Sequence, residues 1–273
     1  MIPRKVHFDL FLFICSSTPE MFVREKLRRR FHSLSANYSL GYFFVLGSNP
    51  ELNEQIRDEN QKYLDILQFD HVDSYHHITL SVFGAIQYLS QIHVNTSYYM
   101  KTDSDCVLNV PRLMQYIQTA NRTYIGNCKY KKSYLTYSAL EKRKQRMRRI
   151  IRDKFLRKEA YDLLVKRAIP DSLVGNDTRI TSYATGAGYL IRSDILPQLA
   201  VSIRHLNFIG HNEDVNIGKA MTMLGRPCTL VENWVARRGC ANRTECLDYF
   251  IIHKKNSSME VGKYWDYVME SPI

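Results

Sequence analysis

The chain has 273 residues, of which 45% are hydrophobic and 24% charged, and its formal net charge is +11. This apolar content excludes a disordered chain, and six cysteines are too few for a disulfide scaffold of this length. No glycine- or proline-rich linker and no repeat divides the sequence, so we expect one domain with a substantial core.

The amino-terminal half alternates between expected strands and helices. The first apolar run, Leu10–Cys15, is too short to span a bilayer, and we interpret it as a buried strand. Apolar residues at helical spacing then predict helices between further strands. The expected strands are residues 10–15, 42–47 and 97–100, and the expected helices are residues 51–63 and 78–89. This order is typical of βαβ units.

Two aspartates follow the third expected strand. Period-2 alternation places Lys101, Asp103 and Asp105 on one side as the chain leaves this strand. An isolated Asp-x-Asp is usually a solvated turn, but here a helix follows, with Asn109 as its cap and Pro111 in its first turn. Since open α/β sheets bind ligands where strands end, Asp103 and Asp105 are candidate metal ligands.

The positive charge is concentrated in one segment. Residues 129–158 carry 13 Lys and Arg against Glu141 and Asp153, so the rest of the chain is neutral. Residues 141–158 have the pattern of an amphipathic basic helix, which is usually a solvated surface helix. No nucleic-acid-binding module accompanies it, so nucleic acid is disfavoured as a partner. Our hypothesis is that residues 141–158 bind an acidic substrate or a charged membrane surface.

The carboxy-terminal half contains a glycine pair and a second acidic pair. Around Gly186 and Gly188 we expect a glycine turn that leads into a strand and permits close backbone approach. Glu213 and Asp214 begin an expected helix that Gly225 ends, and helix capping alone would explain both acids.

Six Asn-x-Ser/Thr sites indicate a secreted or lumenal chain, because such sites are glycosylated only there. The asparagines are Asn37, Asn95, Asn121, Asn176, Asn242 and Asn256. Cys240 and Cys246 form the expected local disulfide. With no clear targeting segment, we expect a lumenal chain to be incomplete at its amino end.

Taken together, the motifs resemble the β-1,3-galactosyltransferase or β-1,3-glycosyltransferase family (glycosyltransferase family 31) of Golgi enzymes. The matching segments are Phe22–Arg28, Phe44–Gly47, Phe69–Tyr75, Met100–Asp105, Gly186–Tyr189, Glu213–Val215 and Ile252–Lys254. The resemblance implies an α/β GT-A fold, with a Rossmann-like mixed sheet flanked by helices, in a single catalytic domain over residues 1–273. It also implies a type II Golgi membrane protein whose anchor and stem are absent from this chain, and the basic insertion of about residues 129–168 has no counterpart.

The resemblance further implies an inverting transfer of galactose or an N-acetylhexosamine from a UDP-sugar to the 3-hydroxyl of a glycan on a glycoprotein or glycolipid. A divalent metal, expected to be Mn²⁺, would be held by Asp105 with His253, assisted by Asp103, and would neutralise charge on the leaving diphosphate. Asp214 is the candidate base for the acceptor hydroxyl, and Glu213 is expected to orient the acceptor or the base.

Matched positions also assign donor and acceptor contacts. The expected donor-binding residues are Arg24, Arg28, Lys101, Asp73 and Asp103, and the expected acceptor-side residues are Gly186, Gly188 and Tyr189. The chain departs from the family pattern at His77 and Ser81, which replace an Asn and a Lys. The alternative function is a catalytically silent lumenal sugar-binding protein on the same fold, although the retained acids and histidine favour the enzyme.

Overall fold

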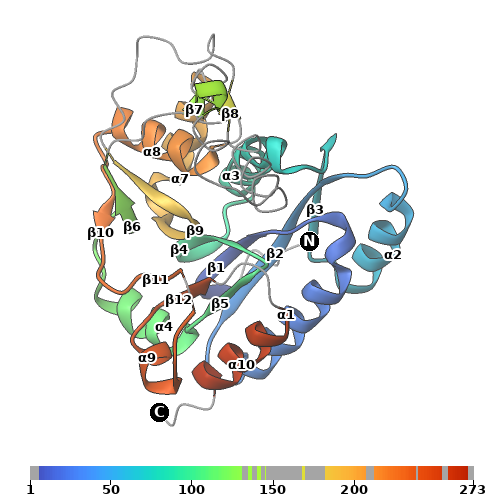
Figure 1. The fold of residues 1–273 in the computed structure, drawn as a ribbon, viewed down its shortest axis with the longest axis vertical. Helices are drawn as coiled ribbons and strands as arrows, with labels where there is room; N and C mark the ends of the chain where they lie inside the picture. Colours follow the sequence, from blue (N-terminus) through green and yellow to red (C-terminus); the bar gives the residue numbers. More distant parts are fainter. Residues whose placement is uncertain are drawn as a thin grey trace.

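The fold is known from a computed structural model, which describes residues 6–130, 135–136, 140–142, 145, 168–169, 182–206, 212–237, 239–253 and 258–269. A seven-stranded mixed sheet, with strand order β10-β6-β9-β4-β1-β2-β3, forms its centre (Figure 1). Its strands are β1 (His7–Cys15), β2 (Leu40–Ser48), β3 (Ile66–Val72), β4 (Asn95–Asp103), β6 (Tyr124–Lys129), β9 (Tyr183–Arg192) and β10 (Thr229–Leu230).

Helices and two smaller sheets surround this centre. The described α-helices are α1 (Met21–Leu34), α2 (Asn53–Tyr63), α3 (Ile78–Ile92), α4 (Val110–Thr119), α7 (Leu196–Arg204), α8 (Glu213–Met223), α9 (Arg243–Leu247) and α10 (Ser258–Met269). The smaller sheets contain β5 (Cys106–Leu108), β12 (Ile251–His253) and β11 (Val235–Ala236), and β7 (Leu135–Thr136) with β8 (Ala168–Ile169). None of the helices that the structure describes is both long and apolar enough to cross a membrane.

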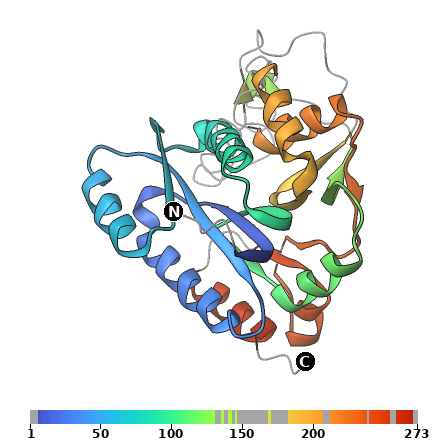
Figure 2. The same ribbon diagram turned by 180° about the vertical axis from the view of Figure 1, so that it is seen from behind.

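Both faces of the large sheet are covered, which explains why β1 is apolar along most of its length. Its side chains alternate between two cores, since Leu10, Leu12 and Ile14 belong to one and Phe11 and Phe13 to the other. The first core contains side chains of α1, α4 and α10, and the second those of α3, α7 and α8. Figure 1 shows these two groups of helices on opposite sides of the sheet, and Figure 2 shows the same layers from behind.

The strand order predicts a ligand-binding position at the carboxyl ends of β1 and β4, which we call the ligand edge of the sheet. Both strands run parallel, and β2 and β3 extend the sheet from β1 on the other side. The chain therefore reverses its direction of winding at the β1–β4 pair, where Cys15 lies opposite Asp103. Ligands of open α/β sheets bind outside the carboxyl ends of strands at such a point.

Most predicted elements are confirmed with small extensions, including the helix cap at Asn109, whose side chain accepts a hydrogen bond from the Arg112 amide. The prediction of a glycine turn before the last long strand is wrong. Gly186 and Gly188 lie within β9, and among the described residues the glycines with positive φ are Gly225 and Gly239. Close packing, described below, is the reason for glycine at both strand positions.

The predicted Cys240–Cys246 disulfide is confirmed. A second disulfide, Cys128–Cys228, joins residues that are 100 positions apart, and no local spacing in the sequence indicated it. It fixes the end of β6 to the residue that precedes β10. Cys15 and Cys106 are free and buried.

Four predicted glycosylation asparagines are exposed: Asn37, Asn95, Asn121 and Asn242. Asn176 and Asn256 lie outside the described residues. The predicted basic helix over residues 141–158 also lies almost wholly outside them, apart from three exposed residues, 141, 142 and 145.

Candidate active site

Hydrogen bonds fix the loops at the carboxyl ends of β1 and β4. The Ser104 amide donates to the Cys15 carbonyl at 2.9 Å, which joins the two strand ends. Glu20 Oε2 accepts from the Ser104 hydroxyl at 2.8 Å and from the Ser16 hydroxyl and the Ser17 amide, both at 2.9 Å. One carboxylate oxygen of Glu20 thus links the loop after β1 to the loop after β4.

Asp105 and His253 meet at this edge, although 148 positions separate them in the sequence. His253 Nε2 lies 3.2 Å from Asp105 Oδ2, because β12 pairs with β5 and places His253 opposite Cys106. The ligand atoms of Asp105, Cys106 and His253 all lie within 4.8 Å of one another. The side chains of Asp105 and His253 are 48% and 16% exposed, so a cation has access to both.

The chemistry of Asp105 and His253, rather than that of Cys106, fits a divalent cation such as Mn²⁺. Burial raises the pKa of the Cys106 thiol well above its ordinary value, and its Sγ donates to the Ala187 carbonyl at 3.2 Å. Burial opposes ionisation of Asp105, but the contact with His253 outweighs it and lowers the pKa of Asp105. The carboxylate and the imidazole supply oxygen and nitrogen donors, which suit Mn²⁺ better than a thiolate site would.

Lys101 links the two acidic motifs. Its Nζ lies 2.5 Å from Asp103 Oδ1 and 3.2 Å from Glu213 Oε1, and it donates to the Gly186 carbonyl at 2.5 Å. The side chain of Lys101 is 1% exposed. Burial would lower the pKa of Lys101, but Asp103 and Glu213 raise it well above the ordinary value, so the ammonium is charged. Burial raises the pKa of Asp103, although Lys101 opposes this shift.

Both acids of the second pair lie in the first turn of α8, as predicted. Glu213 is buried, whereas Asp214 is half-buried, and Asp214 Oδ1 accepts a hydrogen bond from the Val215 amide at 2.8 Å. A Cβ atom at Gly186 would lie 2.6 Å from Glu213 Oε1. Glycine at this position of β9 therefore makes room for the Glu213 carboxylate.

The predicted acceptor-side residues occupy tightly packed positions. A Cβ atom at Gly188 would lie 2.5 Å from Ile251 Cδ1, so the core leaves no room for a side chain at this position. Tyr189 is 0% exposed, and its ring packs edge-on against Tyr124 at a centroid distance of 5.7 Å. The structure gives these residues packing roles, and an acceptor contact stays a prediction.

Asp73 also reaches the carboxyl edge of the sheet. Its Oδ2 accepts from the Thr18 amide at 2.5 Å and from the Thr18 hydroxyl at 2.8 Å. Asp73 thus fixes the loop after β1 from the end of β3, and its side of the edge is compatible with the predicted donor contact. That contact stays a prediction.

Arg24 and Arg28 have internal carboxylate partners. Arg24 Nη2 lies 2.6 Å from Glu59 Oε2, and Arg28 contacts Glu59 at 2.7 Å and Asp65 at 2.8 Å. The Arg24 side chain is 0% exposed and that of Arg28 is 7% exposed. Their predicted contact with donor phosphates would require these ion pairs to open, and it stays a prediction.

The structure therefore brings together Asp103, Asp105 and His253 with Glu213, through Lys101 and the β5–β12 pair. Sequence reasoning missed Glu20, although Ser17-x-x-Glu20 is the pattern of a capping box, which the structure contains. It also missed Cys106 and Glu59, whose partners depend on contacts between distant segments.

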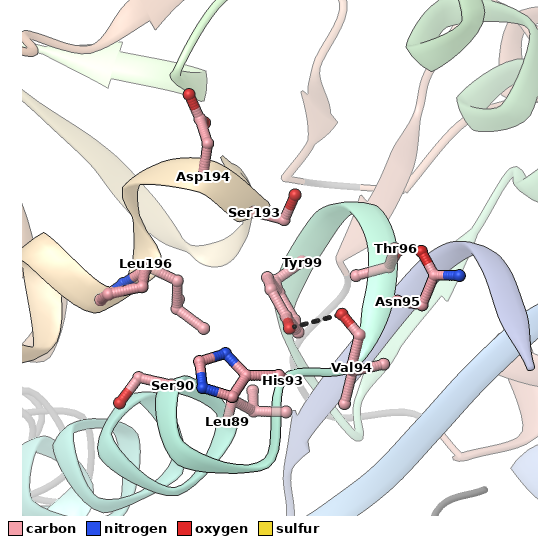
Figure 3. A pocket seen from close by; sticks show the side chains of 11 residues that line it. Leu89, Ser90, His93, Val94, Asn95, Thr96, Tyr99, Ser193, Asp194 and Leu196 are labelled. Carbon is pink, nitrogen blue, oxygen red and sulfur yellow. Dashed lines mark hydrogen bonds between the residues drawn. The ribbon is translucent and has the colours of Figure 1, made fainter. Parts of the chain in front are cut away.

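A pocket of about 270 Å³ lies at the opposite edge of the sheet, between the end of α3 and the turn before α7 (Figure 3). His93, Asn95, Asp194 and Leu196 are among its lining residues. It contains none of the predicted catalytic, metal or donor residues, so it is separate from the candidate site.

The family described as "Galactosyltransferase" matches residues 23–229. UDP-GalNAc:β-1,3-N-acetylgalactosaminyltransferase 1 of Rattus norvegicus is 25% identical over 189 residues, covering 67% of this chain and 49% of the relative. β-1,3-Galactosyltransferase 1 of Homo sapiens is 26% identical over 184 residues, with the same coverage of 67% and 49%. The chain thus spans about half the length of the curated relatives it matches.

Solved structures show only a loose likeness. The WbbM bifunctional glycosyltransferase gives a TM-score of 0.49 at 8% identity, covering 99% of this chain and 51% of that one. Mouse xyloside xylosyltransferase 1 gives a TM-score of 0.40 at 11% identity, covering 94% of this chain and 99% of that one. The predicted α/β class, with a mixed sheet flanked by helices, is confirmed by the strand order itself.

Proposed function

This chain belongs to the galactosyltransferase family, and on that premise we propose that it transfers galactose or an N-acetylhexosamine from a UDP-sugar to the 3-hydroxyl of an acceptor glycan, with inversion at the sugar. The observation that carries the proposal is the meeting of Asp105 with His253, beside an Asp103 that Lys101 connects to Glu213. These contacts unite three segments that are distant in sequence at the ligand edge of the sheet.

Asp105 and His253 are the residues that would hold the metal, with Asp103 beside them. When bound, a divalent cation such as Mn²⁺ supplies electrostatic stabilisation of the diphosphate that leaves with the nucleotide. The oxygen and nitrogen donors of these residues match the preference of that ion, and their exposure matches a site that must also admit a substrate.

Asp214 is the proposed general base. An acceptor hydroxyl is a weak nucleophile, so its proton passes to a carboxylate as its oxygen bonds to the anomeric carbon and the bond to UDP breaks. Asp214 is half-buried at the start of α8, directly after Glu213, whose carboxylate is tied to Lys101. Glu213 is proposed to orient this base.

We also propose a single catalytic domain over residues 1–273, acting in the Golgi lumen on glycoprotein or glycolipid, in a protein that a type II anchor holds in the membrane. The four exposed Asn-x-Ser/Thr asparagines support a lumenal chain. Residues 141–158 are proposed to bind an anionic acceptor or membrane surface. Unchanged acceptor preference and salt dependence after their Lys and Arg are replaced with Gln would contradict this.

The test of the proposed activity is UDP release with Mn²⁺ and a panel of UDP-galactose, UDP-N-acetylglucosamine and UDP-N-acetylgalactosamine, followed by mass analysis of the product. We expect one of these donors to lose its sugar to a glycan acceptor. Asp214→Asn should abolish turnover and leave donor binding largely intact, whereas a silent sugar-binding protein would bind a donor or glycan and release no UDP.

A further inference from the structure

The ammonium group of Lys101 has its partners within the protein. A lysine ammonium has three N–H donors. In this chain, Nζ contacts Asp103 on β4, the Gly186 carbonyl on β9 and Glu213 on α8. With a side chain 1% exposed, Lys101 offers little surface to a substrate. A phosphate oxygen would reach it only by displacing one of these partners.

We propose that Lys101 is a positioning residue that fixes the first turn of α8, and with it Asp214, against Asp103 at the end of β4. The inference rests on the proposed function, because Asp214 and Asp103 have their roles only in that reaction. It replaces the expectation that Lys101 binds donor phosphate with a role that acts through two carboxylates.

The surroundings of Glu213 support this role. Glu213 Oε1 lies 3.2 Å from Lys101 Nζ, and among the described residues it accepts no aligned hydrogen bond. The Glu213 side chain is 8% exposed, so water replaces this contact poorly. A buried carboxylate that loses its cationic partner is left as an uncompensated charge, which strongly destabilises the conformation that buries it. The ion pair with Lys101 therefore stabilises Glu213 Oε1 in this position.

The position of Glu213 is transmitted directly to the proposed base. Asp214 is its neighbour in the first turn of α8, and the helix packs tightly on β9. A Cβ atom at Gly218 of α8 would lie 2.3 Å from Tyr183 Cβ of β9. The contact of Gly218 fixes the middle of α8, and the ion pair of Glu213 with Lys101 fixes its first turn. Loss of that ion pair therefore frees the turn that carries Asp214 to move relative to the end of β4, where Asp103 lies.

Lys101→Met is the first test, because methionine keeps the length of the side chain and removes its charge. We expect kcat to fall by on the order of 100-fold, as misplaced catalytic groups do. We expect the donor KM at saturating Mn²⁺ to change by less than about threefold, since uniform binding is retained. A raised donor KM with unchanged kcat would overturn the proposal in favour of a phosphate ligand.

A merely structural role would lower thermal stability and leave kcat per folded molecule unchanged, and that result would also overturn the proposal. Leu199→Ala is the matched control, because Leu199 is 0% exposed on α7 and has no polar contact to either acidic motif. It should lower the melting temperature and keep kcat.

Glu213→Gln completes a double-mutant cycle. If both residues act through one contact, the double variant Lys101→Met/Glu213→Gln should lose no more activity than Lys101→Met alone. Losses that multiply would show independent roles and contradict the proposal.

Gly186→Ala provides a second route if Lys101→Met does not fold. It keeps every charge and moves the Glu213 carboxylate, since the added Cβ would lie 2.6 Å from Glu213 Oε1. The same fall in kcat is expected, and full activity would contradict the proposal.

Mn²⁺ binding, followed by electron paramagnetic resonance, separates failure of this inference from failure of the proposed function, because it needs no turnover. Lys101 also orients Asp103, so Lys101→Met should weaken Mn²⁺ binding about tenfold, as loss of an outer contact does. Equal affinity of the two proteins overturns the inference. UDP release by the wild type together with equal affinities therefore overturns the inference alone. Absence of UDP release by the wild type overturns the proposed function and, with it, the inference.

Discussion

Two buried clusters of charge in this protein have similar composition but different access to solvent. In the arginine cluster, Arg24 and Arg28 contact Glu59 and Asp65, and the four side chains are 0%, 7%, 2% and 11% exposed. In the lysine cluster, Lys101 and Glu213 are 1% and 8% exposed, but Asp103 is 26% exposed. All four side chains of the arginine cluster are nearly inaccessible to solvent, whereas the lysine cluster has one accessible side chain, Asp103, near Asp105 and His253.

We expect this difference in exposure to separate a structural role from a functional one. The arginine cluster ties α1 to α2 and to the residue before β3, and its charges are satisfied within the protein. The lysine cluster leaves one carboxylate at the edge of the sheet, where a ligand has access. We therefore expect changes in the arginine cluster to alter stability and changes at the open edge to alter activity.

The largest expected effect is that of Asp105→Asn. Loss of this proposed metal ligand should remove several kcal/mol of transition-state stabilisation, which corresponds to at least about a 1000-fold fall in kcat/KM. The melting temperature should change by less than about 2 °C, because the side chain is 48% exposed. UDP release and calorimetry measure the two quantities. Asp58→Asn, at an exposed position of α2, is the control and should retain activity.

Glu59→Gln should give the opposite pattern. It leaves two buried guanidinium groups without their shared carboxylate, so the free energy of unfolding should fall by about 3–5 kcal/mol. Activity per folded molecule should be unchanged. Urea denaturation measures the loss, and Glu54→Gln on the exposed side of the same helix should be neutral. A large fall in donor affinity with unchanged stability would return Arg24 and Arg28 to the donor site.

The stabilisation from Glu59 should depend on pH. Burial would raise the pKa of Glu59, but Arg24 and Arg28 lower it below the ordinary value. A carboxyl with a lowered folded pKa stabilises the protein above its unfolded pKa, about 4.3, and loses that contribution as the pH falls through the folded value. The difference in unfolding free energy between wild type and Glu59→Gln should therefore shrink below about pH 4.3. A difference that stays constant at lower pH would show that the ionised Glu59 carboxylate is not the source of the stabilisation.

The smallest effect is expected for the exposed pair of Arg192 and Asp194, which lie 2.7 Å apart with side chains 35% and 59% exposed. Arg192→Gln should cost less than about 1 kcal/mol of unfolding free energy, because water screens such pairs. Urea denaturation at low and high salt checks it. A loss of unfolding free energy as large as that of Glu59→Gln would show that solvent exposure does not distinguish stabilising ion pairs from weak ones.

Local patterns predicted much of the fold. The apolar run of β1 and the helical spacing of α3 are properties of short segments, and the structure confirms both. Position after a strand correctly placed Asp103 and Asp105 at the edge of the sheet. The resemblance added His253, which lies 3.2 Å from Asp105.

Contacts between distant segments set the limit of prediction. The donor contact of Arg24 stays a prediction, but nothing near Arg24 in sequence shows that Glu59, 35 positions away, is its partner. The Cys128–Cys228 disulfide was missed for the same reason. The glycines of β9 predict a turn from sequence alone, because their local composition is the same whether a turn or a close neighbour requires them.

The most direct test of the central claim is the position of Mn²⁺ in crystals grown with Mn²⁺ and UDP, located by its anomalous scattering. We expect a peak bonded to the carboxylate of Asp105 and the imidazole of His253, with the diphosphate of UDP beside it. A peak at another site, with Asp105 and His253 bound only to each other, would contradict it.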